Sequence, residues 1–219
     1  MDILFLHGAL GCKKHWEPIV SLLSSQSNIH VLDFPSHGDS DVRLNKIQLC
    51  DLVDFVRDYI LKHQLNNVTI VGYSLGGYVG LKLAEEHFSG LEKVITIATK
   101  LNWNKEIASQ EIEQLSKLEH LIPKFEKEHG SNALTLIKNT STILKSIGET
   151  PLIKSEFADV KVPICMLVGE NDTMVTQAEI DEFIEGNSFM EKIVLPEQPH
   201  LLQKMNASVL SQSILDCLK

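Results

Sequence analysis

The chain has 219 residues, a length that suits a single domain formed by residues 1–219. Hydrophobic residues make up 43% of the chain and charged residues 22%, which is ordinary for a globular protein. The net charge of −9 and the lack of any basic block argue against nucleic acid or anionic membrane surfaces as partners. No apolar run approaches the roughly 18 residues of a membrane span, and the N-terminus lacks the features of a signal peptide, so we expect a cytoplasmic protein without a membrane span.

The alternation of apolar runs and helical patterns indicates the fold class. Helical patterns occupy residues 15–26, 45–64, 75–88, 174–185 and 200–218, and Asn45 with Gln48 resembles a capping box at the start of the second. Runs rich in Val and Ile read as buried parallel strands at residues 3–6, 29–32, 68–71, 94–98, 164–168 and 192–195. The pattern predicts an α/β fold: a mostly parallel sheet of about six strands with helices on both faces.

Residues 101–161 interrupt this rhythm, because they contain no convincing strand. Two amphipathic helical patterns occur there instead, with Pro123 expected to kink or end the first helix and with Gly130 and Gly148 as stop signals. An insertion of this length is too long for a plain loop, and we interpret it as a small helical lid within the domain. The alternative is two ordinary helices packed on the edge of the sheet.

Four cysteines, Cys12, Cys50, Cys165 and Cys217, lie far apart in the sequence and show no C-x-x-C spacing. A disulfide framework or a zinc site is therefore not expected. We predict that the cysteines are buried or partly exposed thiols.

The pentapeptide at residues 72–76 (GYSLG) lies between an apolar run and a helical pattern. Glycines at its first and last positions permit a sharp strand-to-helix turn that leaves the Ser74 hydroxyl exposed. The N-terminus of the following helix would favour an oxyanion beside that hydroxyl. Ser74 is thus the candidate nucleophile.

A serine nucleophile needs a base, and the base needs an acidic group to orient it. Asp172 follows a buried apolar run, and His200 lies between the last run and the last helical pattern. Both positions are carboxyl ends of predicted strands, where open α/β sheets place functional groups. We therefore predict Asp172 as the orienting acid and His200 as the base.

Each of these residues has alternatives. Asp172 could also cap a helix that begins near Thr173. Glu170 is a second candidate for the orienting acid, whereas Asp159 precedes its strand and belongs to the opposite edge of the sheet. The remaining histidines on helical patterns, their ends or strand starts are expected to be surface or partly buried residues: His15, His30, His63, His87, His120 and His129.

Five motifs together resemble the α/β-hydrolase superfamily: residues 5–8 (FLHG), 33–40 (DFPSHGDS), 72–77 (GYSLGG), 169–172 (GEND) and 199–200 (PH). Their order along the chain, with serine before aspartate before histidine, is the order of that superfamily. Two departures stand out. The chain begins directly on the strand before the His-Gly turn, so two antiparallel edge strands of the family are expected to be absent. Pro199 replaces the usual glycine before the histidine and should stiffen that loop.

The resemblance also implies two backbone donors for an oxyanion. One is the N–H of Leu75, next to the nucleophile, and the other comes from the His-Gly turn at residues 7–11, with Ala9 as first choice and Leu10 as reserve. His7 is then a structural residue that holds this loop. His37, among Pro, Gly and Asp residues, is expected to stabilise a turn.

The sequence therefore predicts a serine hydrolase of carboxylic esters or thioesters that acts on a small acyl substrate and needs no metal or organic cofactor. The same residues would also serve a lyase or an acyltransferase. A third alternative is a non-catalytic binding protein of this fold, although such a protein need not keep Ser74, Asp172 and His200 together.

Overall fold

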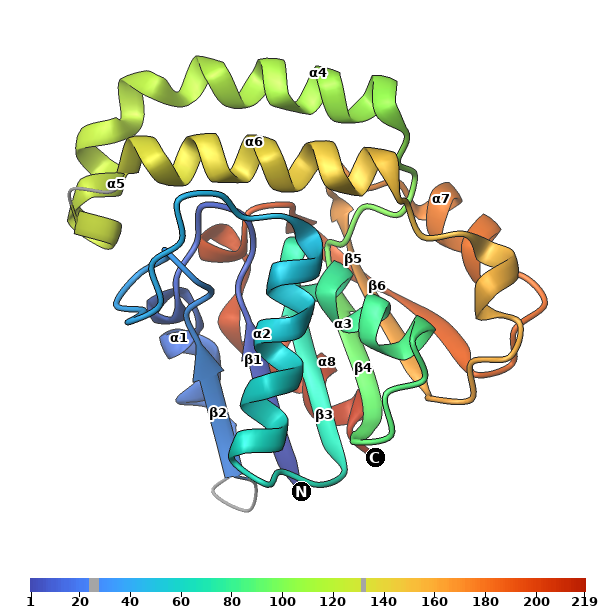
Figure 1. Ribbon diagram of the computed structural model, residues 1–219. Helices are drawn as coiled ribbons and strands as arrows, with labels where there is room; N and C mark the ends of the chain where they lie inside the picture. The colour runs from blue at the N-terminus through green and yellow to red at the C-terminus, as the bar shows by residue number, and fades with distance from the viewer. Residues whose placement is uncertain (24–27, 131–132) are drawn as a thin grey trace.

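A computed structural model describes residues 1–23, 28–130 and 133–219 (Figure 1). Its centre is a six-stranded sheet in the order β2-β1-β3-β4-β5-β6, and all neighbouring strands are parallel. The strands are β1 (Asp2–Leu6), β2 (Asn28–Leu32), β3 (Val68–Tyr73), β4 (Leu91–Ile97), β5 (Ile164–Asn171) and β6 (Met190–Pro199). Each predicted apolar run falls on one of them, so the predicted parallel sheet is confirmed.

Helices connect the strands. The α-helices are α1 (Glu17–Val20), α2 (Leu49–Lys62), α3 (Leu75–Glu85), α4 (Lys105–Ser116), α5 (Ile122–His129), α6 (Ala133–Glu149), α7 (Gln177–Ile184) and α8 (Ala207–Cys217). Short 3-10 helices are η1 (Lys13–Trp16), η2 (Lys117–Leu121), η4 (Lys154–Phe157) and η5 (Leu202–Lys204). The predicted end of the helix at residues 15–26 lies outside the described residues.

The start of α2 differs from the prediction. The capping box is formed by Gln48 and Asp51, whose side chains each bind the other residue's backbone, and not by Asn45 and Gln48. The helix therefore begins at Leu49, because the carboxylate of Asp51 accepts the Gln48 N–H at 2.7 Å and closes the first turn.

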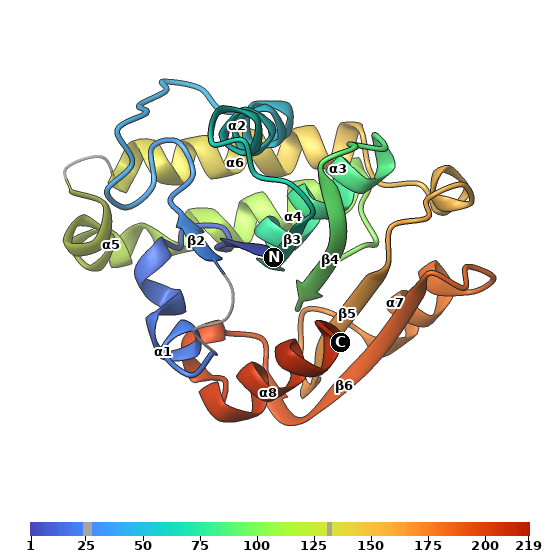
Figure 2. The same ribbon diagram turned by 90° about the horizontal axis from the view of Figure 1, so that it is seen from below.

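Helices cover both faces of the sheet. Successive residues of β1 point to opposite faces, so Leu4 packs in a core cluster with α2, α3 and α7, whereas Phe5 packs in a second cluster with η1, α1 and α8. Figure 2 shows α2 and α3 on one side of the sheet and α1 and α8 on the other. Burial on both faces is the reason that the strands are apolar at nearly every position.

The chain between β4 and β5 forms a separate helical layer. In Figure 1, α4 and α6 lie side by side across the carboxyl ends of the strands, with α5 at one end. Pro123 lies in the first turn of α5, where its missing N–H costs no helical bond, so it begins a helix and does not kink one. Gly130 follows the last residue of α5 with φ of 69°, as expected of a stop. We call residues 105–149, outside the undescribed pair 131–132, the cap segment.

Gly148 is the last residue but one of α6, so the helix ends within one residue of the predicted stop. A Cβ on Gly148 would come within 2.5 Å of the Ala108 Cβ and 2.8 Å of the Asn104 carbonyl oxygen. The glycine therefore allows α6 to approach the start of α4 closely.

The prediction that all four cysteines are thiols is wrong. Cys165 in β5 and Cys217 in α8 form a disulfide with their Cα atoms 6.4 Å apart, while Cys12 and Cys50 are free. The two residues are 52 positions apart in the sequence, and only the packing of α8 on the sheet brings them together. The sequence spacing gave no sign of this tertiary contact.

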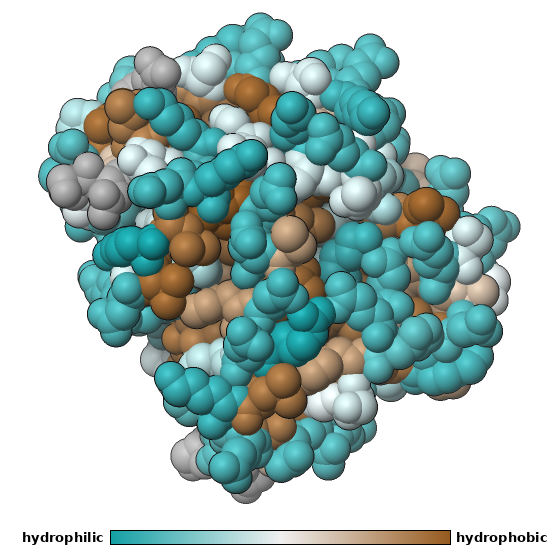
Figure 3. Space-filling model, viewed as in Figure 1, coloured by the Kyte–Doolittle hydropathy of each residue, from teal (hydrophilic) through white to brown (hydrophobic). Residues whose placement is uncertain are grey.

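Among the described residues, no helix is long and apolar enough to cross a membrane. On the face drawn in Figure 3, hydrophilic residues predominate, and hydrophobic residues gather below the two long helices of the cap segment.

Candidate active site

Ser74 occupies a sharp turn between β3 and α3. Its backbone has φ of 50° and ψ of −111°, a conformation that costs a non-glycine residue roughly 1–3 kcal/mol. Hydrogen bonds hold it there: the Ser74 N–H donates to the Ile97 carbonyl at 2.8 Å, and its carbonyl accepts the Tyr78 N–H at 3.0 Å and the Thr99 hydroxyl at 3.1 Å. No local sequence pattern indicates the Thr99 bond, because Thr99 follows the neighbouring strand β4.

The glycines on either side of Ser74 are required by close backbone contacts. A Cβ on Gly72 would lie 2.3 Å from the carbonyl carbon of Gly76. A Cβ on Gly76 would lie 2.3 Å from the carbonyl oxygen of Leu6 in β1. Side chains at these positions would push the turn away from the sheet, which is the physical reason for the GYSLG pattern.

Asp172 and His200 are brought together by neighbouring strands. Asn171 at the end of β5 is paired with Pro199 at the end of β6, so the residues that follow each strand are adjacent. The His200 Nδ1 lies 2.9 Å from Oδ2 and 3.0 Å from Oδ1 of Asp172. The Asp172 side chain is fully buried, and His200 is 9% exposed.

The environment of Asp172 favours its charged form. Burial alone would raise the pKa of this carboxyl, but the His200 hydrogen bond outweighs it together with two backbone N–H groups, and the pKa is lowered. Those N–H groups belong to Met174 and Val175 and donate to Oδ1 at 2.8 and 2.9 Å. Asp172 is not a helix cap, since α7 begins at Gln177 and is capped by Thr176.

His200 lies beside the strand that carries Ser74. The ring centroids of Tyr73 and His200 are 5.7 Å apart. Among the described residues, the Ser74 hydroxyl and His200 share no hydrogen bond in this structure. Such bonds are often long in ligand-free enzymes and tighten when substrate binds.

The two alternative acids, Glu170 and Asp159, do not contact His200. Glu170 is exposed, and its carboxylate accepts the N–H of Glu197 at 3.0 Å instead of a bond from His200. Asp159 is also exposed and precedes β5, at the opposite edge of the sheet. Only Asp172 of the three candidates contacts His200.

The predicted oxyanion loop lies against the Ser74 turn. A Cβ on Gly8 would be 3.3 Å from the Ser74 Cβ, which places this backbone next to the serine. The Gly11 N–H donates to the Gly8 carbonyl at 3.0 Å and closes a turn with Ala9 and Leu10 in its central positions. The Ala9 N–H is not used in closing that turn. Leu75 is the first residue of α3, where the backbone N–H has no partner within the helix.

His7 joins two loops at the carboxyl edge of the sheet. Its Nδ1–H donates to the Gly8 carbonyl at 2.8 Å, and its Nε2 accepts the Phe34 N–H at 3.1 Å. Burial lowers the pKa of His7 to about 3, so the ring is neutral at neutral pH. These bonds support the prediction that His7 holds its loop. His37 is likewise buried and binds the Pro35 carbonyl through Nδ1 at 3.0 Å, as expected of a residue that stabilises a turn.

His129 was predicted to be a surface or partly buried residue, and it is in fact 2% exposed. It lies at the end of α5, and both of its ring nitrogens are within hydrogen-bonding distance of loops that follow β1 and β2. Its partners are more than ninety positions away in the sequence, so no local pattern could have identified this role.

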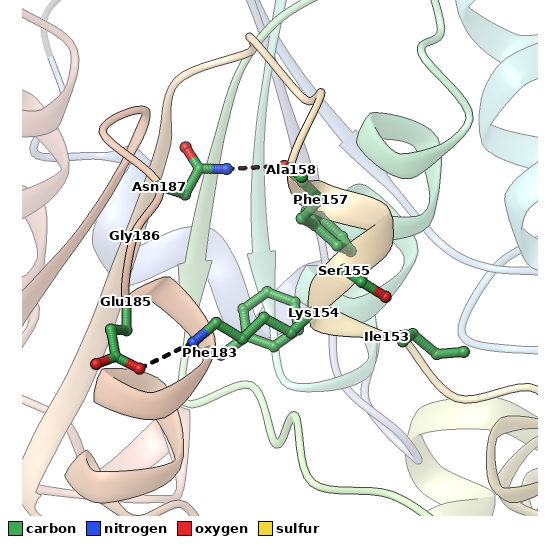
Figure 4. A pocket seen from close by; sticks show the side chains of 9 residues that line it. All are labelled: Ile153, Lys154, Ser155, Phe157, Ala158, Phe183, Glu185, Gly186 and Asn187. Atoms are coloured by element: carbon green, nitrogen blue, oxygen red, sulfur yellow. Dashed lines mark hydrogen bonds and ion pairs between the residues drawn. The ribbon is translucent and has the colours of Figure 1, made fainter.

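One cavity lies apart from these residues (Figure 4). It has a volume of about 480 Å³ and lies between η4 and the end of α7. Its wall contains the ion pair of Lys154 with Glu185, at 3.1 Å, and the Asn187 amide, which donates to the Phe157 carbonyl at 2.8 Å. None of the predicted site residues lines it.

These features define an α/β protein whose candidate catalytic groups gather at the carboxyl edge of a parallel sheet. A family model described as the alpha/beta hydrolase fold matches residues 3–135, and the chain belongs to this family. Relatives and structural neighbours named as a synthase, a probable acetyltransferase and an esterase are enzymes.

Over 203 residues, the chain is 26% identical to a 2-succinyl-6-hydroxy-2,4-cyclohexadiene-1-carboxylate synthase of Photorhabdus laumondii, covering 78% of this chain and 70% of that protein. It is also 36% identical over 87 residues to a probable alcohol acetyltransferase of Cyberlindnera fabianii, covering 39% of this chain and 24% of that protein.

Solved structures share the fold. An esterase from Thermogutta terrifontis superposes with a TM-score of 0.80 at 17% identity, covering 100% of this chain and 89% of that one. NosK from Streptomyces actuosus has a TM-score of 0.84 at 15% identity, covering 99% of this chain and 96% of that one.

Proposed function

We propose that this chain is a serine hydrolase that cleaves the carboxylic ester or thioester bond of a small acyl substrate. The observation that carries the proposal is the buried pair of Asp172 and His200 beside the strained turn of Ser74. A carboxylate that holds Nδ1–H of an imidazole leaves Nε2 free to accept a proton, which is the state required of a general base.

In the proposed mechanism, the Ser74 hydroxyl attacks the acyl carbon while His200 takes its proton. His200 then gives this proton to the leaving alcohol or thiol, and Asp172 stabilises the imidazolium formed in between. The N–H groups of Leu75 and Ala9 bind the oxyanion of each tetrahedral intermediate. Water activated by His200 then releases the acyl group from Ser74.

We further propose that the cap segment is a lid whose inner surface selects the acyl group. It lies across the carboxyl ends of the strands, where this family of folds places its substrates. Partly buried Leu10 from the proposed oxyanion loop packs against the apolar cluster of α4, α5 and α6, and this contact supports the proposal.

Hydrolysis of p-nitrophenyl acetate and of an acetyl thioester tests the reaction. We expect Ser74→Ala to lose at least about 10⁴-fold in kcat, since removal of a triad member leaves little more than binding and oxyanion stabilisation. Ser109→Ala is the control, because this exposed hydroxyl only binds the Lys105 carbonyl within α4. Full activity in a folded Ser74→Ala protein would refute the proposal.

The match to an alcohol acetyltransferase favours acyl transfer as the second candidate. In that reaction an alcohol replaces water in the second step at the same Ser74 ester. Adding ethanol to the ester assay and measuring ethyl acetate against free acetate distinguishes the two: a hydrolase yields mostly acetate, and a transferase yields mostly the new ester.

A further inference from the structure

His129 connects the cap segment to two loops of the site. Its side chain is fully buried. Nδ1 lies 2.9 Å from the Gly38 nitrogen, and Nε2 lies 3.1 Å from the Leu10 carbonyl oxygen. Because Gly38 can only donate through its backbone N–H, Nδ1 must be the acceptor. The ring proton therefore sits on Nε2 and is donated to Leu10.

Both partners of His129 have left-handed backbone conformations, and that of Leu10 is unfavourable for a residue with a side chain. Leu10 has φ of 55°, which costs a leucine about 1–2 kcal/mol, and Gly38 has φ of 46°. The Leu10 side chain also packs on the cluster of the cap segment that contains Phe125 and Ile137. The cap segment thus holds Leu10 by its carbonyl and by its side chain.

This support matters because of where Leu10 lies. The Leu10 carbonyl and the Gly11 N–H belong to one peptide group, and the Gly8 carbonyl and the Ala9 N–H belong to another. The Gly11 N–H donates to the Gly8 carbonyl at 3.0 Å and links the two groups across the turn. The energy of an oxyanion hydrogen bond depends on the donor being directed at the oxyanion before the reaction begins. A bond that holds the Leu10 carbonyl therefore helps to orient the Ala9 N–H through the hydrogen bond between Gly11 and Gly8.

We propose that His129 is a positioning residue. Through its bond to the Leu10 carbonyl, the assembly of the oxyanion site depends on the cap segment being packed against the loops that follow β1 and β2. This inference rests on the proposed function. The ring itself touches no reacting atom, and it acts only through the turn. When α5 moves away from the sheet, the turn loses its bond at the Leu10 carbonyl and keeps the bond from His7 to the Gly8 carbonyl, so the Ala9 donor is held less firmly.

Two variants separate this role from simple packing. In His129→Gln, the amide nitrogen takes the place of Nε2 and keeps the bond to Leu10, whereas the Gly38 bond is lost. In His129→Asn, the shorter side chain keeps an acceptor near Nδ1 for Gly38, whereas the Leu10 bond is lost. Each variant loses one neutral hydrogen bond, so a purely structural residue would make their effects alike.

The measurements are the second-order rate constant of labelling by a fluorophosphonate, kcat and KM for p-nitrophenyl acetate, and urea unfolding. We expect His129→Asn to lower the labelling rate and kcat about 10- to 100-fold with little change in KM, as misplacement of a catalytic group does. We expect His129→Gln to stay within about 3-fold of the unaltered protein in kcat and to lose comparable stability.

Equal loss of kcat in the two variants, or wild-type kcat in both, would overturn the inference while the unaltered protein still reacts. If His129→Asn does not fold, His129→Gln alone decides, because a folded Gln variant that loses 10-fold or more in kcat contradicts the proposed role. An unaltered protein that neither reacts with the probe nor hydrolyses the ester would refute the proposed function, and this inference with it.

Discussion

Replacing Asp172 by asparagine should abolish the basicity of His200 without disturbing the fold. The backbone N–H groups of Met174 and Val175 both bind Oδ1, so the amide oxygen of the asparagine stays in that position. The NH2 group then occupies the place of Oδ2, 2.9 Å from the His200 Nδ1. Because an NH2 group can only donate, Nδ1 must become the acceptor and the ring proton must move to Nε2.

A ring with its proton on Nε2 cannot accept the proton of Ser74. In a serine protease this change of tautomer lowers kcat about 10⁴-fold, which corresponds to about 5.4 kcal/mol of transition-state stabilisation. We expect a similar loss in Asp172→Asn, measured as kcat for p-nitrophenyl acetate at pH 7.5, with unfolding by urea to verify that the protein is folded.

Glu170→Gln is the matched control, because it removes a neighbouring carboxylate that binds the Glu197 N–H and not His200. Its kcat should change less than about 3-fold. Folded Asp172→Asn that keeps more than a tenth of the activity, or equal losses in the two variants, would show that Asp172 does not set the tautomer of His200.

Three further predictions concern stability, each measured by urea unfolding. Gly76→Ala should lower the free energy of unfolding by about 3 kcal/mol or more, because its Cβ would meet the Leu6 carbonyl oxygen at 2.3 Å. Gly186→Ala, with no atom within 4 Å of its Cβ, should lower it by only about 1–2 kcal/mol on account of its positive φ. Equal losses in the two variants would contradict this prediction. A reducing agent should lower the free energy of unfolding of the unaltered protein by about 2–4 kcal/mol and leave that of Cys217→Ser unchanged. If the stability of the unaltered protein does not respond to the reducing agent, a stabilising disulfide is excluded. His7 should lower the free energy of unfolding by about 2 kcal/mol as the pH falls from 6.5 to 5. His7 takes up a proton over this range in the unfolded protein but not in the folded protein, where its pKa is about 3. His7→Gln should lack this part of the pH dependence.

The sheet could be predicted from the sequence because its strands are buried on both faces. Residues such as Ile70 and Val71 point in opposite directions and are both fully buried, which produces the unbroken apolar runs. Helix ends were less predictable. At the start of α2, several polar residues compete for the cap, and the choice of Gln48 depends on the exact path of the chain.

The turn at Ser74 could be predicted from the glycines around it, and Asp172 and His200 from their places at the carboxyl ends of predicted strands. Groups at the carboxyl ends of neighbouring parallel strands must lie at one edge of the sheet, so β5 and β6 bring these two side chains together. The glycines around Ser74 are visible in the sequence because backbone contact leaves no other choice there.

Features that depend on distant contacts could not be predicted. The Cys165–Cys217 disulfide, the role of Gly148 in helix packing and the burial of His129 each require residues far apart in the sequence to meet. A single glycine or histidine in a helical pattern has the same local appearance whether it is exposed or packed against another element. Only the arrangement of the cap segment over the sheet distinguishes these cases.

Labelling with a fluorophosphonate probe, followed by peptide mass mapping, tests whether Ser74 is the nucleophile. We expect one adduct per chain, on the peptide that contains Ser74, with loss of labelling in Ser74→Ala and retention in Ser109→Ala. A folded protein that remains unlabelled, or one whose adduct maps to another residue and persists in Ser74→Ala, would show that Ser74 is not the nucleophile.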